Sequence, residues 1–419
     1  VEEIYTSLQQ KNLIYTKDID QAFDTKENMF LPDRFIRGTC PKCAAKDQYG
    51  DACENCGATY SPDELINPIS TLSNSEPIWK KSEHFFFKLS EFENELTQWI
   101  EDAKLHKNIK NKLAEWFEMG LKDWDISRDD PYFGFKIPGT KNKYFYVWLD
   151  APIGYLASFL SLCKNRDDLN YNAYFKKDSH HELYHFIGKD IVYFHTLFWP
   201  AVLEGAGIRK PTSVFAHGFL TINSKKMSKS RGTFINAKTY LDNLDPNFIR
   251  YYYASKLGPS MEDIDLNMDD FIARVNSDLI GKLINIASRC SGFINKNFNG
   301  ELSRELDDPK LFNTFLQCSQ SIADHYEARE YSKAMKQIMQ LADKANRYIE
   351  EKKPWVMIKK EEQHEEVQLV CTQGLNLFRM LLIYLTPVIP EISDKAKSFF
   401  NEENWHWDDT LSPILGTKI

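Results

Sequence analysis

The run Leu183-Tyr-His-Phe-Ile-Gly-Lys-Asp190 has the length and apolar content of a buried β-strand that ends at Gly188. A helical pattern follows it from Ile191 to Leu203. Upstream, Lys143-Tyr-Phe-Tyr-Val-Trp-Leu-Asp150 is a similar run before a helical pattern from Ile153, and downstream Ser213-Val-Phe-Ala-His-Gly218 is a third run. Strands that alternate with helices predict an α/β fold with a parallel sheet, and ligands of such sheets sit at the carboxyl ends of the strands. Those ends are residues 148–152, 188–190 and 217–218.

The segments on either side of this region have different patterns. Residues 1–143 combine a short amphipathic helix, a cysteine-rich region, a strand-like run at 83–88 and a helical stretch from about 90 to 121. From about residue 276 onward the pattern is almost wholly helical, and Pro354 stops one of the helices. Four or five such helices predict a bundle.

The composition, with 42% hydrophobic and 27% charged residues in a chain of 419, is that of a globular protein of two to four domains. No apolar run approaches the ~20 residues that a membrane span needs, and the N-terminus lacks the pattern of a secretion signal. We therefore expect a cytoplasmic protein with no membrane partner. The net charge of −8 excludes a protein that coats nucleic acid through bulk positive charge, so any RNA contact must be local.

Four of the eight cysteines form two Cys-x-x-Cys pairs, Cys40 with Cys43 and Cys53 with Cys56, separated by nine residues. Two such pairs can present four thiolates tetrahedrally to Zn²⁺. Disulfides or redox activity are the alternatives, and a reducing compartment disfavours them. Four sulfur ligands leave no open position on the metal, so we expect one structural zinc ion in a knuckle at about residues 36–62.

A basic loop is expected at Asn223-Ser-Lys-Lys-Met-Ser-Lys-Ser-Arg-Gly232, which holds four cations, no acid and a closing glycine. Lysines on such a loop can swing onto a polyphosphate and neutralise the charge that develops on a leaving group. The alternative is a solvated basic loop with no ligand.

Four features together resemble methionyl-tRNA synthetases, class I aminoacyl-tRNA synthetases, of the bacterial type with a four-cysteine knuckle. They are Lys226-Met-Ser-Lys-Ser230, the two cysteine pairs, Trp148-Leu-Asp-Ala-Pro-Ile-Gly-Tyr155 and Pro354-Trp355. The resemblance implies a partial Rossmann-like nucleotide fold, a zinc-knuckle connective-peptide domain and a C-terminal α-helical bundle. In the family's order these are the connective peptide (1–143), the second half of the catalytic domain (144–218), the stem-contact region (219–275) and the anticodon-binding domain (276–419).

The activity implied is that of a methionine–tRNA ligase, which activates L-methionine with ATP and Mg²⁺ and transfers it to tRNA(Met). One departure is large, because the family's His-Ile-Gly-His signature is absent and no His-x-Gly-His occurs in the 419 residues. We therefore expect an incomplete chain, lacking the first half of the catalytic fold and a C-terminal stretch, that is inactive alone. The alternative function is a non-catalytic zinc-containing module that binds tRNA or another partner. The sequence leaves the oligomeric state open.

The resemblance also implies roles for single residues in catalysis. Lys229, assisted by Lys226, would stabilise the pyrophosphate as the methionine carboxylate attacks the α-phosphorus. Arg128 matches an active-site arginine, with an ordinary salt bridge as the alternative. The nucleotide contacts by the same resemblance are Gly188, Asp190, His217 and Gly218, and the alternative for His217 is a core histidine.

The expected methionine pocket is an apolar slot that fits an unbranched thioether and rejects shorter or branched side chains. By the resemblance it is formed by Trp148, Ala151, Pro152, Tyr155, Ile191, Phe194 and His195. Without the resemblance, the larger apolar members of this set would be assigned to the core.

For the tRNA anticodon, Asn285 and Arg289 lie one helical turn apart and Trp355 follows the helix-stopping Pro354. A ring exposed at a helix end can stack on an unpaired base while arginine and asparagine contact the base edge. The alternative is that Trp355 fills the core of the bundle.

Overall fold

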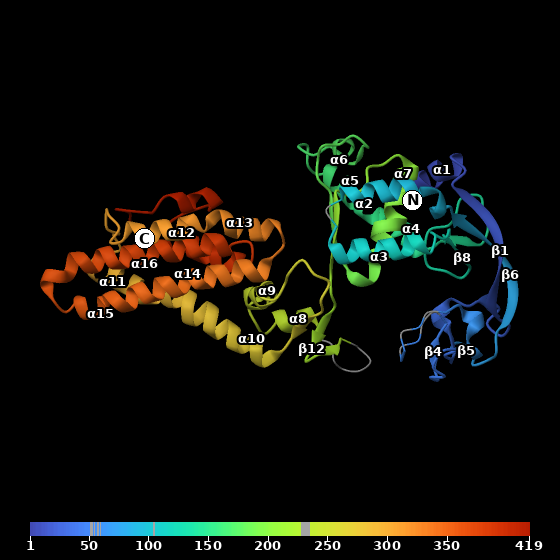
Figure 1. The fold of residues 1–419 in the computed structure, drawn as a ribbon, viewed down its shortest axis with the longest axis horizontal. Helices are drawn as coiled ribbons and strands as arrows, with labels where there is room; N and C mark the ends of the chain where they lie inside the picture. Colours follow the sequence, from blue (N-terminus) through green and yellow to red (C-terminus); the bar gives the residue numbers. More distant parts are fainter. Residues whose placement is uncertain (51–52, 54, 57, 59, 104, 228–234) are drawn as a thin grey trace. The chain divides into compact units, whose positions relative to one another are not determined.

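The computed structural model describes residues 1–419 except 51–52, 54, 57, 59, 104 and 228–234, and it divides into two compact units, Val1–Phe215 and Ala216–Ile419 (Figure 1). Each unit has its own core.

A long antiparallel ribbon organises the first part of unit 1. The ribbon follows helix α1 (Glu2–Gln10) and consists of strands β1 (Ile14–Asp24) and β6 (Ile78–Phe87). The two strands pair from Ile14 opposite Phe87 to Phe23 opposite Ile78. The short strands β2 (Met29–Phe30) and β7 (Trp124–Asp125) complete the sheet in the order β2-β1-β6-β7. The strand predicted at 83–88 is therefore the end of a longer one.

The cysteine-rich region is an excursion from this ribbon with a small sheet of its own, in the order β4-β3-β5 (Figure 1). Its strands are β3 (Ile36–Thr39), β4 (Gln48–Tyr49) and β5 (Ile66–Ser70). Among the described residues, the buried apolar cluster beneath it contains seven, two of them cysteines: Ala22, Leu31, Ile36, Cys40, Cys53, Tyr60 and Leu65. A buried cluster of this size stabilises such a fold too little by itself, so a bound metal ion or a covalent cross-link is needed.

The helical stretch predicted from 90 to 121 is two helices, α2 (Glu93–Asp102) and α3 (Lys107–Glu118). α3 begins where the His106 side chain accepts a hydrogen bond from the backbone N–H of Asn108, which caps its N-terminus. The helices bury apolar faces that include Leu96, Ile100 and Leu113.

The α/β part of unit 1 differs from prediction at its first strand. Only β9 (Lys143–Phe145) is extended, and it pairs antiparallel with β8 (Ser127–Asp129) rather than joining a parallel sheet. The chain then turns into the short helix α4 (Val147–Asp150) and the predicted helix α5 (Ile153–Cys163). A short apolar run does not distinguish a buried strand from a buried helix, and here Leu149 is buried within α4.

The other two predicted strands are confirmed as β10 (Tyr184–Gly188) and β11 (Ser213–His217), which form a two-stranded sheet. The backbone N–H of Thr212 donates to the Leu183 carbonyl, so both strands begin at the same edge and run in the same direction. α6 (Tyr171–Phe175) precedes β10. The predicted helix after β10 is the 3₁₀ turn η4 (Lys189–Ile191), the π-helix η5 (Phe194–Phe198) and α7 (Trp199–Ala206).

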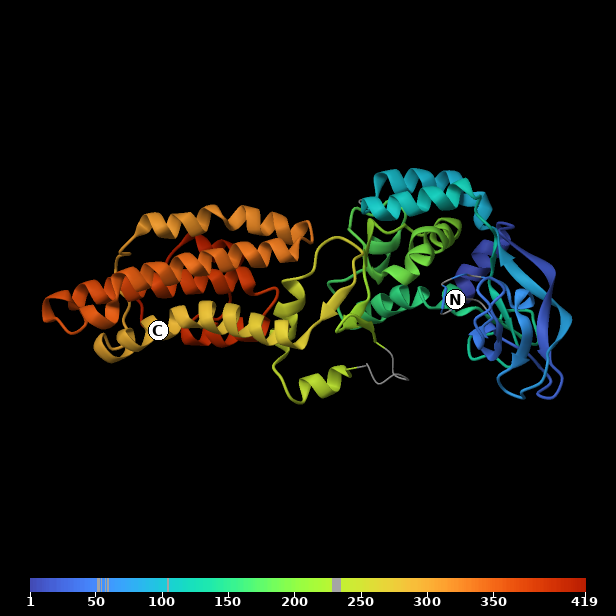
Figure 2. The same cartoon turned by 60° about the horizontal axis from the view of Figure 1, so that its bottom comes forward.

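Unit 2 begins with a small sheet in the order β13-β12-β14, in which β12 (Leu220–Ile222) pairs antiparallel with β13 (Lys225–Lys226) and parallel with β14 (Ile264–Leu266). The helical part that follows confirms the predicted bundle; α11, α14 and α16 pack against one another (Figure 2). The helices are α8 (Ala237–Leu241), α9 (Pro246–Ala254), α10 (Met268–Arg274), the π-helix η6 (Val275–Ile284), α11 (Asn285–Asn297), α12 (Pro309–Gln317), α13 (Ser319–Glu327), α14 (Tyr331–Lys352), α15 (Pro354–Met357), α16 (His364–Leu385) and α17 (Pro390–Phe399).

One helix of the described residues, Glu361–Leu385, is long and apolar enough to cross a membrane by length and composition. Its most apolar window is 89% buried inside the protein, which is the environment of the central helix of a bundle core.

Candidate active site and metal centre

Two aromatic rings form the centre of the predicted methionine pocket in unit 1. Trp148 of α4 stacks on Phe194 of η5, with ring centroids 4.2 Å apart and an interplanar angle of 12°. Trp124 packs edge-on against the same Phe194 ring at 5.1 Å. π-Helical turns are frequent at functional sites, and this one places Phe194 and His195 at adjacent positions beside α4.

The buried His195 side chain is fixed at both ring nitrogens. Nδ1 lies 3.0 Å from the Ile191 carbonyl oxygen and Nε2 lies 3.0 Å from the Tyr155 hydroxyl. Burial lowers the pKa of His195, so the ring is neutral at pH 7. Nδ1 therefore donates to the carbonyl, and Nε2 accepts from the tyrosine hydroxyl.

Some of the predicted pocket residues contact one another in the structure, and others do not. Trp148, Phe194, His195 and Tyr155 are joined by the ring contacts and the hydrogen bond described above, and Ile191 contributes its carbonyl. At the α4–α5 junction Pro152 is buried and Ala151 is exposed.

Sequence reasoning missed His185, which lies on β10 beside this group. Its ring is 5.1 Å from that of Tyr155 and 5.7 Å from that of His195, and its Nδ1 has no hydrogen-bond partner among the described residues. It also lines a cavity of about 500 Å³ together with Tyr155 and Phe159. A single histidine in an apolar strand gave no signal, because its neighbours are distant in the chain.

The residues predicted to contact the nucleotide fall in both units. In unit 1, Gly188 ends β10, and a Cβ at this position would lie 2.6 Å from Asp190 Oδ1, so the glycine makes room for that carboxylate. In unit 2, the exposed His217 bonds through Nδ1 to the Gly218 carbonyl at 2.7 Å, which disfavours the alternative of a core histidine. A Cβ on Gly218 would lie 2.1 Å from the Glu262 carbonyl oxygen, a distance that excludes any side chain.

Lys229 of the predicted phosphate clamp lies outside the described residues, and Lys226 belongs to β13, where it is the register partner of Thr221. The turn before β13 is described: Asn223 and Ser224 have φ of 48° and 61°, the left-handed conformation of tight hairpin turns. Asp265 of β14 holds this turn, since its Oδ1 accepts 2.7 Å hydrogen bonds from the Thr221 hydroxyl and from the Ser224 N–H.

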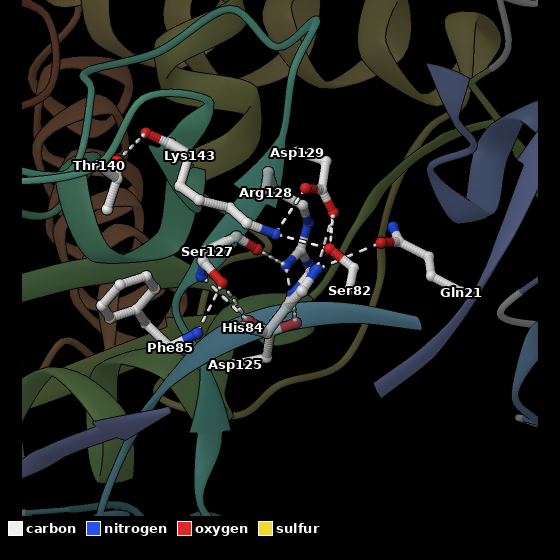
Figure 3. A network of polar contacts seen from close by, with 10 residues as sticks. All are labelled: Gln21, Ser82, His84, Phe85, Asp125, Ser127, Arg128, Asp129, Thr140 and Lys143. Atoms are coloured by element: carbon white, nitrogen blue, oxygen red, sulfur yellow. Dashed lines mark hydrogen bonds and ion pairs between the residues drawn. The ribbon is translucent and has the colours of Figure 1, made fainter. Parts of the chain in front are cut away.

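Arg128 projects from β8 into a polar network in unit 1 (Figure 3). Its guanidinium carbon lies 3.9 Å from the centroid of the Tyr146 ring, and Nη1 bonds the Ser127 carbonyl at 2.6 Å and Asp125 Oδ2 at 3.3 Å. No described residue accepts a hydrogen bond from its Nε or Nη2. The salt bridge named as the alternative is therefore present, but it leaves two of the three guanidinium nitrogens available for an anion.

The four cysteines Cys40, Cys43, Cys53 and Cys56 form a cluster whose sulfur atoms all lie within 4.8 Å of one another. The two knuckles share an equivalent hydrogen bond, since Cys40 N–H donates to Ala45 O and Cys53 N–H to Ala58 O, each at 2.9 Å. Hydrogen bonds from the Ala45 backbone and the Asn55 side chain lower the pKa of Cys43 to about 6, which favours the thiolate that a metal binds. The cluster can hold one tetrahedral metal ion.

The predicted anticodon residues lie together at one end of the bundle in unit 2. Asn285 Nδ2 donates to Asn346 Oδ1 at 3.0 Å, and Arg289 pairs with Glu350 at 3.0 Å while its guanidinium lies 5.3 Å from the Trp355 ring centroid. Pro354 is buried. Trp355 is partly buried against the core rather than fully exposed, so it combines features of both interpretations.

Comparison with known families agrees with this arrangement. Residues 1–291 match the model described as tRNA synthetases class I (M), and residues 302–417 match the anticodon binding domain of methionyl tRNA ligase. Since the first match spans more than half of the 419 residues, the chain belongs to the class I tRNA synthetases.

Within that class, both matches place it in the methionyl-tRNA synthetase family, and it is an aminoacyl-tRNA ligase. The family binds methionine, ATP and tRNA(Met).

Solved structures of methionyl-tRNA synthetase from Mycobacterium tuberculosis share the fold. One, in complex with methionyl-adenylate, has a TM-score of 0.76 and 21% identity over 100% of this chain and 77% of that chain. A second, bound by methionyl-adenylate, has a TM-score of 0.73 and 22% identity over 96% of this chain and 74% of that one. The apo form has a TM-score of 0.72 and 20% identity over the same shares.

Proposed function

We propose that the site in unit 1 binds methionine for its activation by ATP, with the roles predicted from the sequence. The methionine side chain would lie against the Trp148–Phe194 stack, whose polarisable faces suit a thioether. The observation that carries this proposal is the rigid arrangement of neutral rings, in which His195 and Tyr155 satisfy each other's polar atoms. A rigid slot of this kind disfavours side chains that do not fill it, and each missing methylene lowers the favourable binding free energy by roughly 1–3 kcal/mol.

In the proposed reaction, a methionine carboxylate oxygen forms a bond to the α-phosphorus of ATP, and the bond from that phosphorus to the bridging oxygen breaks. Pyrophosphate leaves with the electron pair, and the transfer step then exchanges AMP for the tRNA 3′ end. No protein group needs to carry a proton in the first step, so positioning and charge stabilisation dominate. Arg128, Lys226 and Lys229 would supply that charge, with Gly188, Asp190, His217 and Gly218 contacting the nucleotide and Mg²⁺ on its phosphates.

The metal of the cysteine cluster is proposed to be one structural zinc ion. A zinc ion about 2.3 Å from each of four tetrahedral sulfurs sets the sulfurs about 3.8 Å apart. The Cys40–Cys56 and Cys43–Cys53 sulfur pairs are separated by 3.9 Å and 3.6 Å, which supports this assignment. Zinc at this site would stabilise the small knuckle core and take no part in the chemistry.

The domain assignment (1–143 with its knuckle, 144–218, 219–275 and 276–419) is also proposed. The division of the chain at Phe215/Ala216, close to the boundary at 218, supports it. For the last domain we propose that Asn285, Arg289, Pro354 and Trp355 contact the anticodon. We also propose a cytoplasmic location, which the match to the class I tRNA synthetases supports.

Methionine-dependent ATP–pyrophosphate exchange tests the function, measured with the 419 residues and with any longer natural form of the protein. Lys229→Ala should lower the exchange rate by on the order of 10²–10³. Lys225→Ala, which removes the same charge four residues earlier in the sequence, is the matched control and should lower it far less. Exchange that depends equally on leucine would contradict the methionine pocket. tRNA binding without exchange in any form would favour the non-catalytic module, and exchange by the 419 residues alone would contradict the expectation that they are inactive.

A further inference from the structure

His84 is a buried histidine in the middle of β6, only 1% exposed, to which the proposed reaction assigns no role. Its Nδ1 lies 2.8 Å from Asp125 Oδ2 and its Nε2 lies 3.0 Å from Asp129 Oδ2 (Figure 3). Nε2 also lies 3.2 Å from the Gln21 side-chain oxygen. Each ring nitrogen thus faces oxygen acceptors, and only an imidazolium can donate from both.

The carboxylates of Asp125 and Asp129 differ in their other hydrogen-bond partners. Asp129 also binds Lys143, at 2.5 Å, and the Ser82 hydroxyl, at 2.8 Å, so it belongs to a buried and locally paired group. Asp125 shares its Oδ2 between His84 and Arg128, while its Oδ1 accepts from the N–H and the hydroxyl of Ser127 at 3.0 and 3.1 Å. The Asp125 carboxylate is therefore fixed in rotation, and it links the buried histidine to the arginine.

The charges of the group determine what Arg128 can do. His84, Arg128 and Lys143 are the cations, Asp125 and Asp129 are the anions, and Lys17, exposed and opposite His84 in the strand register, faces the same side. With His84 charged, the five-residue group has one positive charge in excess. With His84 neutral, that excess is lost, one ring nitrogen would turn a lone pair toward a carboxylate, and Asp125 would be free to neutralise Arg128.

Burial lowers the pKa of His84, but hydrogen bonds to Asp125 and Asp129 outweigh burial and raise the pKa above its ordinary value. The same hydrogen bonds, with those from Lys143, outweigh burial at Asp129 and lower its pKa. Both directions agree with the charged arrangement that the geometry indicates.

We infer that His84 is a positioning residue for the reaction: through Asp125 it fixes the guanidinium of Arg128 over Tyr146 and leaves its charge available to a bound anion. The inference rests on the proposed function of Arg128. Two residues connect Arg128 to the methionine pocket. Trp124, which packs against Phe194, lies on β7, the strand before that of Arg128. Tyr146, whose ring Arg128 contacts, directly precedes α4, which carries Trp148.

Three variants and one double variant test this in the exchange assay. His84→Gln keeps one donor and loses the charge, and it should lower kcat/KM by on the order of 10- to 100-fold, the cost of a misplaced site group. Ser82→Ala is the matched control, since Ser82 lies on the same strand, is buried and contacts Asp129 and Lys143 but not Asp125. It should change the rate less than about threefold.

The decisive comparison is His84→Gln in an Arg128→Ala background. If His84 acts through Arg128, the second substitution should add no further loss of rate. An equal fractional loss with and without Arg128 would assign His84 a merely structural role and overturn the inference, and so would wild-type kinetics of the single variant.

A readout without activity separates failure of this inference from failure of the proposed function. In the ¹⁵N-arginine-labelled chain, His84→Gln should speed solvent exchange of the Arg128 Nη1 protons, because Nη1 is the nitrogen that donates to Asp125, and Ser82→Ala should not. If exchange activity is absent in every form, the proposed function fails while this measurement still decides the inference. If His84→Gln does not fold, the ring ¹⁵N shifts of the wild-type His84 decide it: two protonated nitrogens at pH 7 support it, and a single neutral tautomer overturns it.

Discussion

Replacement of His185 by phenylalanine should make the first unit less sensitive to acid. The His185 side chain is 7% exposed on β10 and lies against Tyr155 and His195. Burial, and next the neighbouring His195, lower the pKa of His185 from 6.5 to about 4. Protonation in the folded state would place a charge among apolar rings with no acceptor for Nδ1 among the described residues.

The sign and size of the effect follow from proton linkage. Because the folded pKa lies below the unfolded one, the unfolded chain binds the proton first as the pH falls. The stability that His185 contributes is complete above about pH 6.5 and is lost progressively between about pH 6.5 and 4. With a folded pKa of about 4, the loss between pH 7 and pH 5 is about 2 kcal/mol.

Native-state hydrogen exchange of β10 amides is a suitable assay, because the two compact units need not unfold together. Between pH 7 and 5 the opening free energy should fall by about 2 kcal/mol less in His185→Phe than in the wild type. His180→Gln, at an exposed position, is the control and should match the wild type. An NMR titration that gives His185 a pKa near 6.5, or equal pH dependence in variant and wild type, would refute the reasoning.

Three further predictions concern the metal, the loop and the RNA. Cys43→Ser, or prolonged chelation, should remove about one zinc per chain, as measured by metal analysis, and abolish amide protection in residues 36–50, as measured by hydrogen exchange. A metal-free knuckle whose amides stay protected would contradict the structural role of the metal. Asp265→Ala should cost about 1–3 kcal/mol locally by leaving the Ser224 turn unheld, and it should lower the exchange rate while Asp269→Ala does not. Trp355→Ala should weaken tRNA binding by about 1–3 kcal/mol at fixed salt without altering exchange, whereas the exposed Val356→Ala should change neither.

The elements with strong local patterns could be predicted from the sequence. The strand before Gly188, the helix after Ile191, the two cysteine knuckles and the C-terminal bundle all have periodicity or spacing that does not depend on distant residues. The stretch 143–150 was predicted wrongly as one strand, because apolar content alone cannot separate a three-residue strand followed by a helical turn from a single buried strand.

The missed site residues depend on contacts between distant positions. His84 meets Asp125 and Asp129 across 41 and 45 residues, and the two strands that carry these acids have only two and three residues. His185 becomes distinctive only when β10, α5 and η5 pack together. Such residues have no motif, since their chemistry comes from tertiary neighbours that differ in spacing from fold to fold.

The close contact between Gly218 and the Glu262 carbonyl limits which residues can occupy position 218. The Glu262 carbonyl oxygen occupies the space where even a methyl group would sit, and that carbonyl lies two residues before β14, which pairs with β12 and carries Asp265. A random library at this codon should therefore return glycine alone among active clones. The residue two positions before β12 therefore tolerates no side chain, whereas the exposed Asn223 in the following turn is constrained only by its left-handed φ of 48°, which asparagine and glycine adopt readily.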